Sequence, residues 1–291
     1  MFIPYSTEVL IKKWPISNLV IMGGCIVAFV LLLAGALSDA VLEALILSGW
    51  SPLGLVGHQF LHTGLWHLVF NMLFLWVFGN AVCEKVGNIA YGLLFLSAGI
   101  LGGVVHNLLD GAPAVGASGA INGVIGFYLV LYPVNRVNCF YWFFRPGTFA
   151  IRGFWLILFW FVVDAWSAFS GADTGTAYWA HIGGFASGFA FGFLFLKTGL
   201  AKMADYDNPT LLDYLQGKHK ARSGLAYEKQ SFLRAPPLPS RPPLPRPAPP
   251  KTTGATRDIN LDCPHCGQNL DVPREMMGSA FPCPSCRGAI Q

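Results

Sequence analysis

Residues 177–196 read AYWAHIGGFASGFAFGFLFL, a run of 20 residues without Asp, Glu, Lys or Arg. A helix of about 20 apolar residues is long enough to cross the hydrocarbon core of a bilayer, so this run predicts a transmembrane helix. Within it, Gly184, Gly188 and Gly192 recur every four residues and share one helix face with Ala180. Side chains this small let a second helix approach very closely. The stretch therefore predicts a membrane helix packed tightly against a neighbour.

Five further apolar runs lie upstream, at residues 19–37, 65–82, 89–109, 118–131 and 154–169. The apolar run of the first is too long for a secretory signal peptide, and no small-residue cleavage site is followed by a soluble mature domain. Of the 291 residues, 54% are hydrophobic and only 12% are charged, whereas an ordinary soluble domain carries about 25% charge. That composition excludes a purely soluble protein. We therefore expect an all-α polytopic membrane protein with six transmembrane helices.

Lysine and arginine side chains predict how these helices are oriented. Up to residue 200, every basic side chain falls at a connection on one side of the membrane: Lys12, Lys13, Lys85, Arg136, Arg145, Arg152 and Lys197. The positive-inside rule places that side and both termini in the cytoplasm, which predicts a multi-pass protein of the cytoplasmic (inner) membrane. Seven acidic residues balance these seven, so the net charge of +4 belongs to the tail. A charge that small does not predict nucleic acid as a partner.

The composition changes after residue 200, which divides the chain into three predicted parts. A membrane domain covers 1–200, a cytoplasmic polar and Pro-rich linker covers 201–258, and a small terminal domain covers 259–291. Residues 235–250, APPLPSRPPLPRPAPP, favour a polyproline II spacer. A docking motif for an SH3-like partner is the alternative.

The terminal domain carries two CxxC pairs, Cys263 with Cys266 and Cys283 with Cys286. Each pair places two thiolates at one turn, and two such pairs complete a closed tetrahedral metal site. The spacing resembles that of a zinc ribbon and predicts a structural zinc ion, which would supply most of the folding energy of so short a segment. Two disulfides or a redox pair are the alternative, which the cytoplasmic side disfavours. A partner for this ribbon is left open.

Four polar side chains from three predicted spans lie at a similar depth in the outer half of the membrane. His67 and Asn71 occupy the first turns of the second span, Ser118 opens the fourth, and His181 lies one turn into the sixth. Polar groups inside spans are expensive and are functional candidates by default. Ser118 and His181 can form a nucleophile and a general base. His67 and Asn71, four residues apart on one face, can both donate to an oxyanion.

Structural roles are the alternatives for these four residues. A serine among glycines is typical of a tight helix–helix contact, and a lone histidine is often a satisfied core residue. His67 and Asn71 can equally join two helices by hydrogen bonds. Asp164, the one acid inside a span, is interpreted as bonded to its neighbours rather than as a third catalytic group. His106 and Asp110 are interpreted as solvated ends of the third span.

The residues fit one known family when they are taken together. HQFLHTGLWHLVFNMLFLW at 58–76, GASGA at 116–120 and AHIGGFASG at 180–188, in this order and in a six-span setting, resemble the rhomboid family of intramembrane serine proteases. The resemblance covers about residues 19–196 and implies a six-helix rhomboid-like bundle.

The resemblance also implies roles for individual residues. It implies a dyad of Ser118 as nucleophile and His181 as general base, with an oxyanion hole from Asn71, His67 and the Ser118 backbone N–H. It implies that residues 38–64 form a membrane-embedded first loop with His62 as a structural histidine beneath it, and that the fifth span and residues 171–176 form a gate and cap. The residues expected to support the site are His62, Gly116, Gly119, Asn122 and Gly184. No cofactor is expected for catalysis.

Two positions depart from the family pattern. Many members carry an aromatic residue four positions after the serine, where this chain has Asn122, which we interpret as a hydrogen-bond partner for the imidazole. Some members carry a Trp-Arg pair in the first loop, where Leu53 and Gly54 stand here. Neither change removes a reacting group.

The predicted activity is therefore that of an intramembrane serine endopeptidase that cleaves single-span or other transmembrane proteins in the lipid bilayer. A catalytically inactive rhomboid-like scaffold that binds membrane clients is the first alternative, and a histidine-lined transporter is the second. The absence of an HExxH motif, of a second embedded acid and of an embedded lysine excludes the other intramembrane protease chemistries.

Overall fold

The computed structural model of the chain describes residues 2–142, 145–171, 175–219, 259–273 and 278–290. These residues fall into two units, Met1–Arg234 and Ala235–Gln291, which we call the membrane unit and the ribbon unit. The predicted polyproline spacer at 235–250, with its alternative as a docking motif, lies outside the described residues.

Five helical segments of the described residues are long and apolar enough to cross a membrane. The second of them is continuous from Leu65 to Val86 but changes to a π-helical turn in its middle. The segments are α1 (Ile16–Leu33), α4–η2–α5 (Leu65–Phe74, Leu75–Gly79, Asn80–Val86), α6 (Asn88–Leu109), α8 (Gly153–Ser170) and α9 (Tyr178–Thr198). This arrangement confirms a polytopic helical membrane protein.

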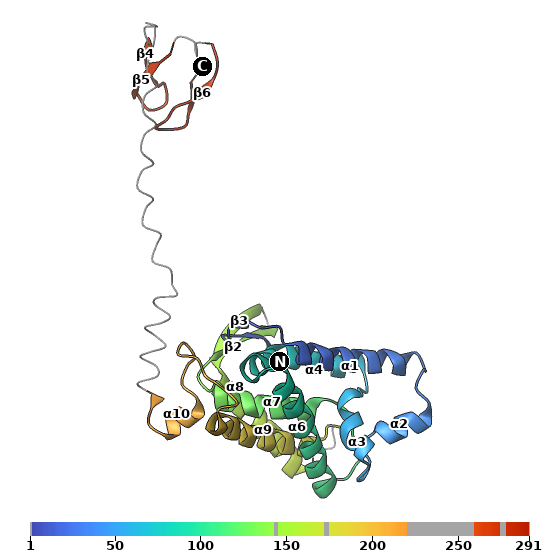
Figure 1. Cartoon of the computed structure of the whole chain (residues 1–291). Coiled ribbons are helices and arrows are strands. Elements are labelled where there is room, and N and C mark those ends of the chain that lie inside the picture. Colours follow the sequence, from blue (N-terminus) through green and yellow to red (C-terminus); the bar gives the residue numbers. More distant parts are fainter. Residues whose placement is uncertain (1, 143–144, 172–174, 220–258, 274–277, 291) are drawn as a thin grey trace. The chain divides into compact units, whose positions relative to one another are not determined.

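The remaining predicted span is present as α7 (Ser118–Leu131), which is only 14 residues long. A helix of that length rises about 21 Å, about 9 Å less than the hydrocarbon core. From Gly119 onward every residue of α7 is buried except Asn122. Figure 1 shows α7 inside the bundle, with α6 and α9 alongside it. Because α7 is short and enclosed, its first residue, Ser118, lies within the bundle rather than at its surface.

The first loop folds over the start of α7. It contains α2 (Asp39–Leu45), α3 (Pro52–Gly57) and the short turn η1 (His58–Phe60). Leu47 and Ala114 form a bridge of two backbone hydrogen bonds, and the Gly116 N–H donates to the His58 carbonyl at 2.8 Å. Irregular backbone is tolerated at membrane depth where it is buried in protein. The loop thus fixes the chain immediately before Ser118.

A polar cluster ties three spans together at the π-helical turn. The Asn18 side chain of α1 donates to the Leu75 carbonyl at 2.8 Å and to Asn80 Oδ1 at 2.7 Å, and it accepts from the Tyr91 hydroxyl at 2.6 Å. All three side chains are buried. The Asn80 backbone N–H closes the π-helical turn on the Leu75 carbonyl, and the Asn18 amide is a second donor to the same oxygen.

An antiparallel sheet of three strands, in the order β1-β2-β3, adds to the helices of the membrane unit. Its strands are β1 (Phe2–Thr7), β2 (Arg136–Trp142) and β3 (Pro146–Arg152), and α8 begins directly after β3. The sequence analysis did not predict this sheet. Strand β1 joins a hairpin more than 100 positions away in the chain, and such long-range pairing leaves no local periodic signal.

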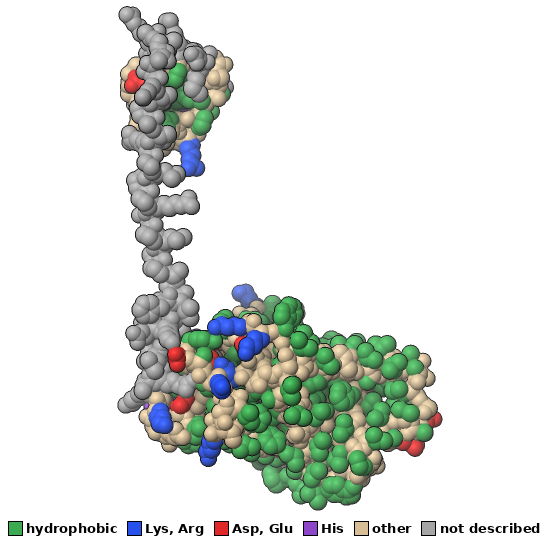
Figure 2. Space-filling model, viewed as in Figure 1, with side chains coloured by type: hydrophobic (Ala, Val, Ile, Leu, Met, Phe, Trp, Pro, Cys, Tyr) green, Lys and Arg blue, Asp and Glu red, His purple; other side chains and the backbone are tan. Residues whose placement is uncertain are grey.

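The basic residues gather at one end of the membrane unit. Figure 2 shows Lys and Arg side chains near the sheet and α10 (Leu211–Leu215), while the rest of this face is mostly hydrophobic. Lys85 pairs with Asp207, the Lys12 ammonium donates to the Tyr206 hydroxyl at 2.8 Å, and Asn208 donates to Asn135 at 3.1 Å. Residues 201–219, assigned to the linker from composition, therefore pack on the membrane unit.

The ribbon unit consists of two short hairpins. β4 (Ile259–Asp262) pairs with β5 (Asn269–Val272), and β6 (Phe281–Pro282) pairs with β7 (Ala289–Ile290). Each hairpin carries one CxxC pair at its turn. Its buried apolar side chains are few, as expected for a segment that depends on a metal.

Candidate active site

Ser118 is the first residue of α7, and its side chain meets His181 of α9. Ser118 Oγ and His181 Nε2 lie 2.9 Å apart, which is hydrogen-bond distance. The chain reaches Ser118 through Gly116, whose φ of +131° is one that L side chains rarely adopt. The structure thus brings together the two residues that the sequence predicted as a dyad.

The close contact between α7 and α9 explains this distance. A Cβ added to Gly184 would collide with the Gly119 carbonyl oxygen, and one added to Gly188 would collide with the Gly123 carbonyl oxygen. A Cβ at Gly192 would lie 2.8 Å from Val130. The face predicted from the four-residue spacing is the face that packs on α7. Because the two backbones touch, side chains near the N-terminal ends of both helices can reach each other.

Asp164 of α8 contacts the other side of the same imidazole. Asp164 Oδ2 and His181 Nδ1 lie 2.9 Å apart, and the two side chains are 21% and 13% exposed. From the sequence, Asp164 was interpreted as bonded to its neighbours rather than as a third catalytic group, and its partner His181 was not identified. The chain could not reveal the contact, because it depends on how α8 is rotated and placed against α9. Asp164, His181 and Ser118 form one continuous hydrogen-bonded chain.

α4 supplies the opposite wall of the site. A Cβ added to Gly116 would lie 2.8 Å from His67 Nε2 and 3.6 Å from Ser118 Oγ, so both atoms face the same small space. His67 Nδ1 is hydrogen-bonded to Thr63 Oγ1 at 3.1 Å, a contact that the sequence analysis missed although Thr63 precedes His67 by one helical turn. Asn71 lies one turn further along α4, and its buried amide nitrogen has no hydrogen-bond partner among the described residues.

The structure also shows the hydrogen bonds of three further side chains, His62, Asn122 and His106. His62 is 1% exposed, its ring lies 5.0 Å from the His67 ring, and its Nδ1 is 3.3 Å from the Phe60 carbonyl. Asn122 does not hold the imidazole as expected. Its amide donates to the Ser118 carbonyl at 3.0 Å, because a side chain four residues on reaches back along its own helix. His106, expected to be solvated, is 1% exposed and bonds to the Ala112 carbonyl at 2.8 Å.

Comparison with known protein families decides which family this chain belongs to. Residues 49–198, just over half of the chain, match the model of the rhomboid domain. The chain belongs to the rhomboid family. The match contains Ser118, His181, His67 and Asn71 as well as Asp164.

Individual rhomboids are similar over shorter stretches. The chain is 31% identical over 156 residues to rhomboid protein 1, mitochondrial, of Saccharomyces cerevisiae, covering 50% of this chain and 43% of that protein. It is 27% identical over 137 residues to the rhomboid protease GlpG of Klebsiella pneumoniae (47% and 46%). It is 42% identical over 76 residues to the rhomboid protease GluP of Bacillus subtilis (26% and 15%). The chain thus spans less than half the length of these relatives.

This rhomboid carries a second chemical cluster in its ribbon unit. The four sulfur atoms of Cys263, Cys266, Cys283 and Cys286 all lie within 4.8 Å of one another. Two of the Sγ–Sγ distances are 3.8 Å, which is about the edge of a tetrahedron with metal–sulfur bonds of about 2.3 Å. Backbone N–H groups of Cys286 and Ser285 lower the pKa of the Cys283 thiol to about 6. The donor set therefore fits a structural zinc ion.

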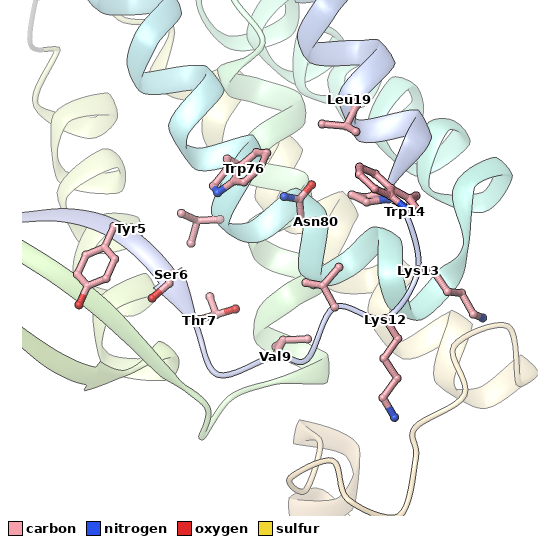
Figure 3. A pocket seen from close by; sticks show the side chains of 13 residues that line it. Tyr5, Ser6, Thr7, Val9, Lys12, Lys13, Trp14, Leu19, Trp76 and Asn80 are labelled. Atoms are coloured by element: carbon pink, nitrogen blue, oxygen red, sulfur yellow. The ribbon is translucent and has the colours of Figure 1, made fainter. Parts of the chain in front are cut away.

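A cavity of about 410 Å³ lies between β1, the segment before α1 and the middle of the second span. Figure 3 shows that the Trp76 and Asn80 side chains extend into it, while those of Lys12 and Lys13 point away. None of the predicted catalytic or oxyanion residues lines this cavity. This cavity is therefore separate from the contact between Ser118 and His181.

Proposed function

We propose that this rhomboid is an intramembrane serine endopeptidase, with Ser118 as nucleophile and His181 as general base and acid. The observation that carries the proposal is the 2.9 Å contact between Ser118 Oγ and His181 Nε2. A serine hydroxyl is a weak nucleophile until an adjacent base accepts its proton. Polar side chains inside membrane helices cost free energy, so a serine and a histidine paired there are candidates for a functional role.

The neighbouring groups support stabilisation of an oxyanion. When Ser118 attacks a peptide carbonyl, negative charge develops on the carbonyl oxygen and must be met by donors that are already in place. Asn71 offers a buried amide nitrogen with no hydrogen-bond partner among the described residues, and the Ser118 backbone N–H stands at the first position of α7, where a helix makes no internal hydrogen bond with it. In the tautomer that serves this role, the Thr63 hydroxyl donates to His67 Nδ1, 3.1 Å away, and the neutral imidazole carries its proton on Nε2, which faces Ser118.

The substrates that fit this location are transmembrane segments of other membrane proteins. A peptide bond inside a helix is shielded from the nucleophile, so a substrate helix must unwind before cleavage. We expect the segment to enter from the bilayer beside α8, whose only buried residues are Gly153, Leu156 and Ile157. The basic residues gather at one end of the membrane unit, which supports an orientation with that end and both termini in the cytoplasm. The membrane would then be the inner membrane of the cell.

The ribbon unit holds one structural zinc ion in this proposal. Ligation by four thiolates leaves no open position, so the ion contributes to folding rather than to catalysis. His265 bonds to the Ala289 carbonyl at 3.1 Å and is a bystander to the metal.

The direct test uses the full chain in liposomes with a model single-span substrate. Wild type is expected to cleave it, and Ser118→Ala is expected to abolish cleavage. Ser187→Ala is the matched control, because Ser187 lies six residues after His181 in α9 and its hydroxyl donates to the Gly184 carbonyl of the same helix at 2.7 Å. Full cleavage by Ser118→Ala would overturn the proposed mechanism. A well-folded wild type that binds the substrate without cleaving it would instead support the scaffold alternative.

A further inference from the structure

We propose that Asp164 is a positioning residue that converts the Ser118–His181 dyad into a triad and makes the base depend on where α8 lies. This inference rests on the proposed function of Ser118 and His181. Its first part is that the Asp164 carboxylate fixes the tautomer and orientation of His181. Its second part is that His181 loses this partner whenever α8 moves away from α9.

The geometry of the imidazole carries the first part. A neutral imidazole has one protonated nitrogen, and the hydrogen bond made at one nitrogen decides the role of the other. A carboxylate accepts only, so Asp164 Oδ2, 2.9 Å from Nδ1, requires the proton on Nδ1. Nε2 is then left with its lone pair toward Ser118 Oγ, 2.9 Å away. This is the tautomer that can accept the serine proton.

The surroundings strengthen the same contact. Asp164 is the only acidic residue of α8, and α7 and α9 contain none. Both partners are largely shielded, with 21% and 13% of their side chains exposed, so the interaction is screened less than a surface ion pair. When His181 takes the serine proton it becomes a cation, and the adjacent carboxylate stabilises that charge. An acid inside an apolar span also needs a partner to offset its cost, and His181 is that partner.

The packing of α8 carries the second part. Its buried residues end at Ile157, so Asp164 lies two turns beyond the well-anchored end of the helix. Beyond that point α8 contacts α9 through aromatic rings, with the Phe161 and Phe185 centroids 4.6 Å apart and those of Phe169 and Trp179 5.0 Å apart. Asp164 is therefore a polar link between the two helices in a region where their other described contacts are between aromatic side chains. A displacement of α8 that admits a substrate would separate Asp164 from His181 until the helix returns.

The test compares Asp164→Asn with Asp164→Glu in the full chain. The amide of Asn keeps the size of the side chain but can donate to Nδ1 and favour the wrong tautomer. We expect Asp164→Asn to lower kcat about 100-fold with little change in KM, and Asp164→Glu to recover most of the loss. Asp110→Asn is the matched control, since Asp110 bonds the Ala112 N–H and lies 4.0 Å from His106.

A spectroscopic measurement separates this inference from the proposed function. Nitrogen NMR of labelled histidine reports which ring nitrogen of His181 carries the proton, and it needs no substrate. We expect protonated Nδ1 in wild type and a mixture or the reverse tautomer in Asp164→Asn. If Asp164→Asn kept full kcat and the wild-type tautomer, the inference would fall while the proposed function stood. If wild type did not cleave, the proposed function would fail and the NMR result would still decide the role of Asp164.

Discussion

Two interfaces meet at His181, and they are built in different ways. α7 and α9 touch backbone to backbone, with Gly184 against the Gly119 carbonyl and Gly188 against Gly123. α8 reaches α9 with aromatic rings and with the Asp164 carboxylate. The glycine contacts of the first interface bring the two backbones together, whereas the second interface is formed by side chains.

This difference separates the contact that is fixed by backbone packing from the contact that can change when α8 moves. Ser118 and His181 are held by the rigid interface, so their 2.9 Å contact follows from the packing of two helices. Asp164 is held by the looser one, so its contact with His181 reports the position of α8. We therefore propose that the rigid interface positions Ser118 and His181, and that the looser interface controls His181 through Asp164.

The largest expected effect comes from breaking the tight interface. Gly184→Val places a branched side chain where the Gly119 carbonyl already lies, so the helices must separate. We expect loss of nearly all cleavage and destabilisation of about 3 kcal/mol, measured by proteolysis in liposomes and thermal unfolding in detergent. Ala186→Val is the control, because Ala186 lies on the exposed face of the same helix. Equal activity of Gly184→Val and wild type would contradict the tight packing.

Substitutions in α4 test whether Ser118 and His181 are sufficient for cleavage without the proposed oxyanion donors. Asn71→Ala removes a buried amide whose nitrogen has no partner among the described residues, and we expect kcat to fall about 100-fold. Asn122→Ala, which removes a donor to the Ser118 carbonyl outside the reacting space, should cost far less. Steady-state kinetics on the two variants decides the point, and a larger loss for Asn122→Ala would refute the role of Asn71.

The loose interface can be weakened without touching a polar group. Phe161→Ala removes the ring that packs on Phe185, so α8 spends less time against α9. We expect kcat to fall about threefold, since loss of about 0.5–1.5 kcal/mol of ring packing shifts the position of α8. Trp166→Ala, a change at a side chain that is 77% exposed, should have no effect.

The double variant Phe161→Ala/Asp164→Asn tests whether the two contacts of α8 act together. If α8 acts through Asp164, Phe161→Ala should have no additional effect in the Asp164→Asn background, because coupled changes are not additive. Independent, multiplying losses would show that α8 influences the reaction by another route.

The smallest effect on cleavage is expected from a change outside both interfaces. Cys283→Ser removes one of the four thiols of the proposed zinc site, so we expect the ribbon unit to lose metal binding and, with it, its fold. Metal content and proteolysis of the ribbon should change, while cleavage by the membrane unit stays within about twofold, because the metal site is closed. A loss of cleavage on the scale of Gly184→Val would show that the ribbon controls the protease.

Much of this arrangement could be predicted from the sequence, for identifiable reasons. Apolar length predicted the spans, and the four-residue glycine spacing predicted the face of α9 that meets α7. The CxxC pairs predicted the thiol cluster. Each of these signals is local in the chain, so no knowledge of the fold was needed to read it.

The contacts that could not be predicted are those between distant segments. Asp164 meets His181 only because α8 has a particular rotation against α9, and a single acid in a span does not reveal its partner. The β1 strand joins a hairpin from the middle of the chain, and residues 201–219 pack on a surface built by other elements. Asn122 was misassigned because its distance along the helix suggested reach but did not determine which neighbouring acceptor it would choose.

The most direct measurement of the central claim is labelling of the full chain in membranes with a fluorophosphonate probe, followed by mass spectrometry of the modified residue. Such a probe reacts only with an activated serine. The account predicts one adduct on Ser118, loss of that adduct in His181→Ala, slower labelling in Asp164→Asn, and no adduct on Ser187. Labelling of Ser118 at the wild-type rate in His181→Ala, or no labelling of a folded wild type, would contradict it.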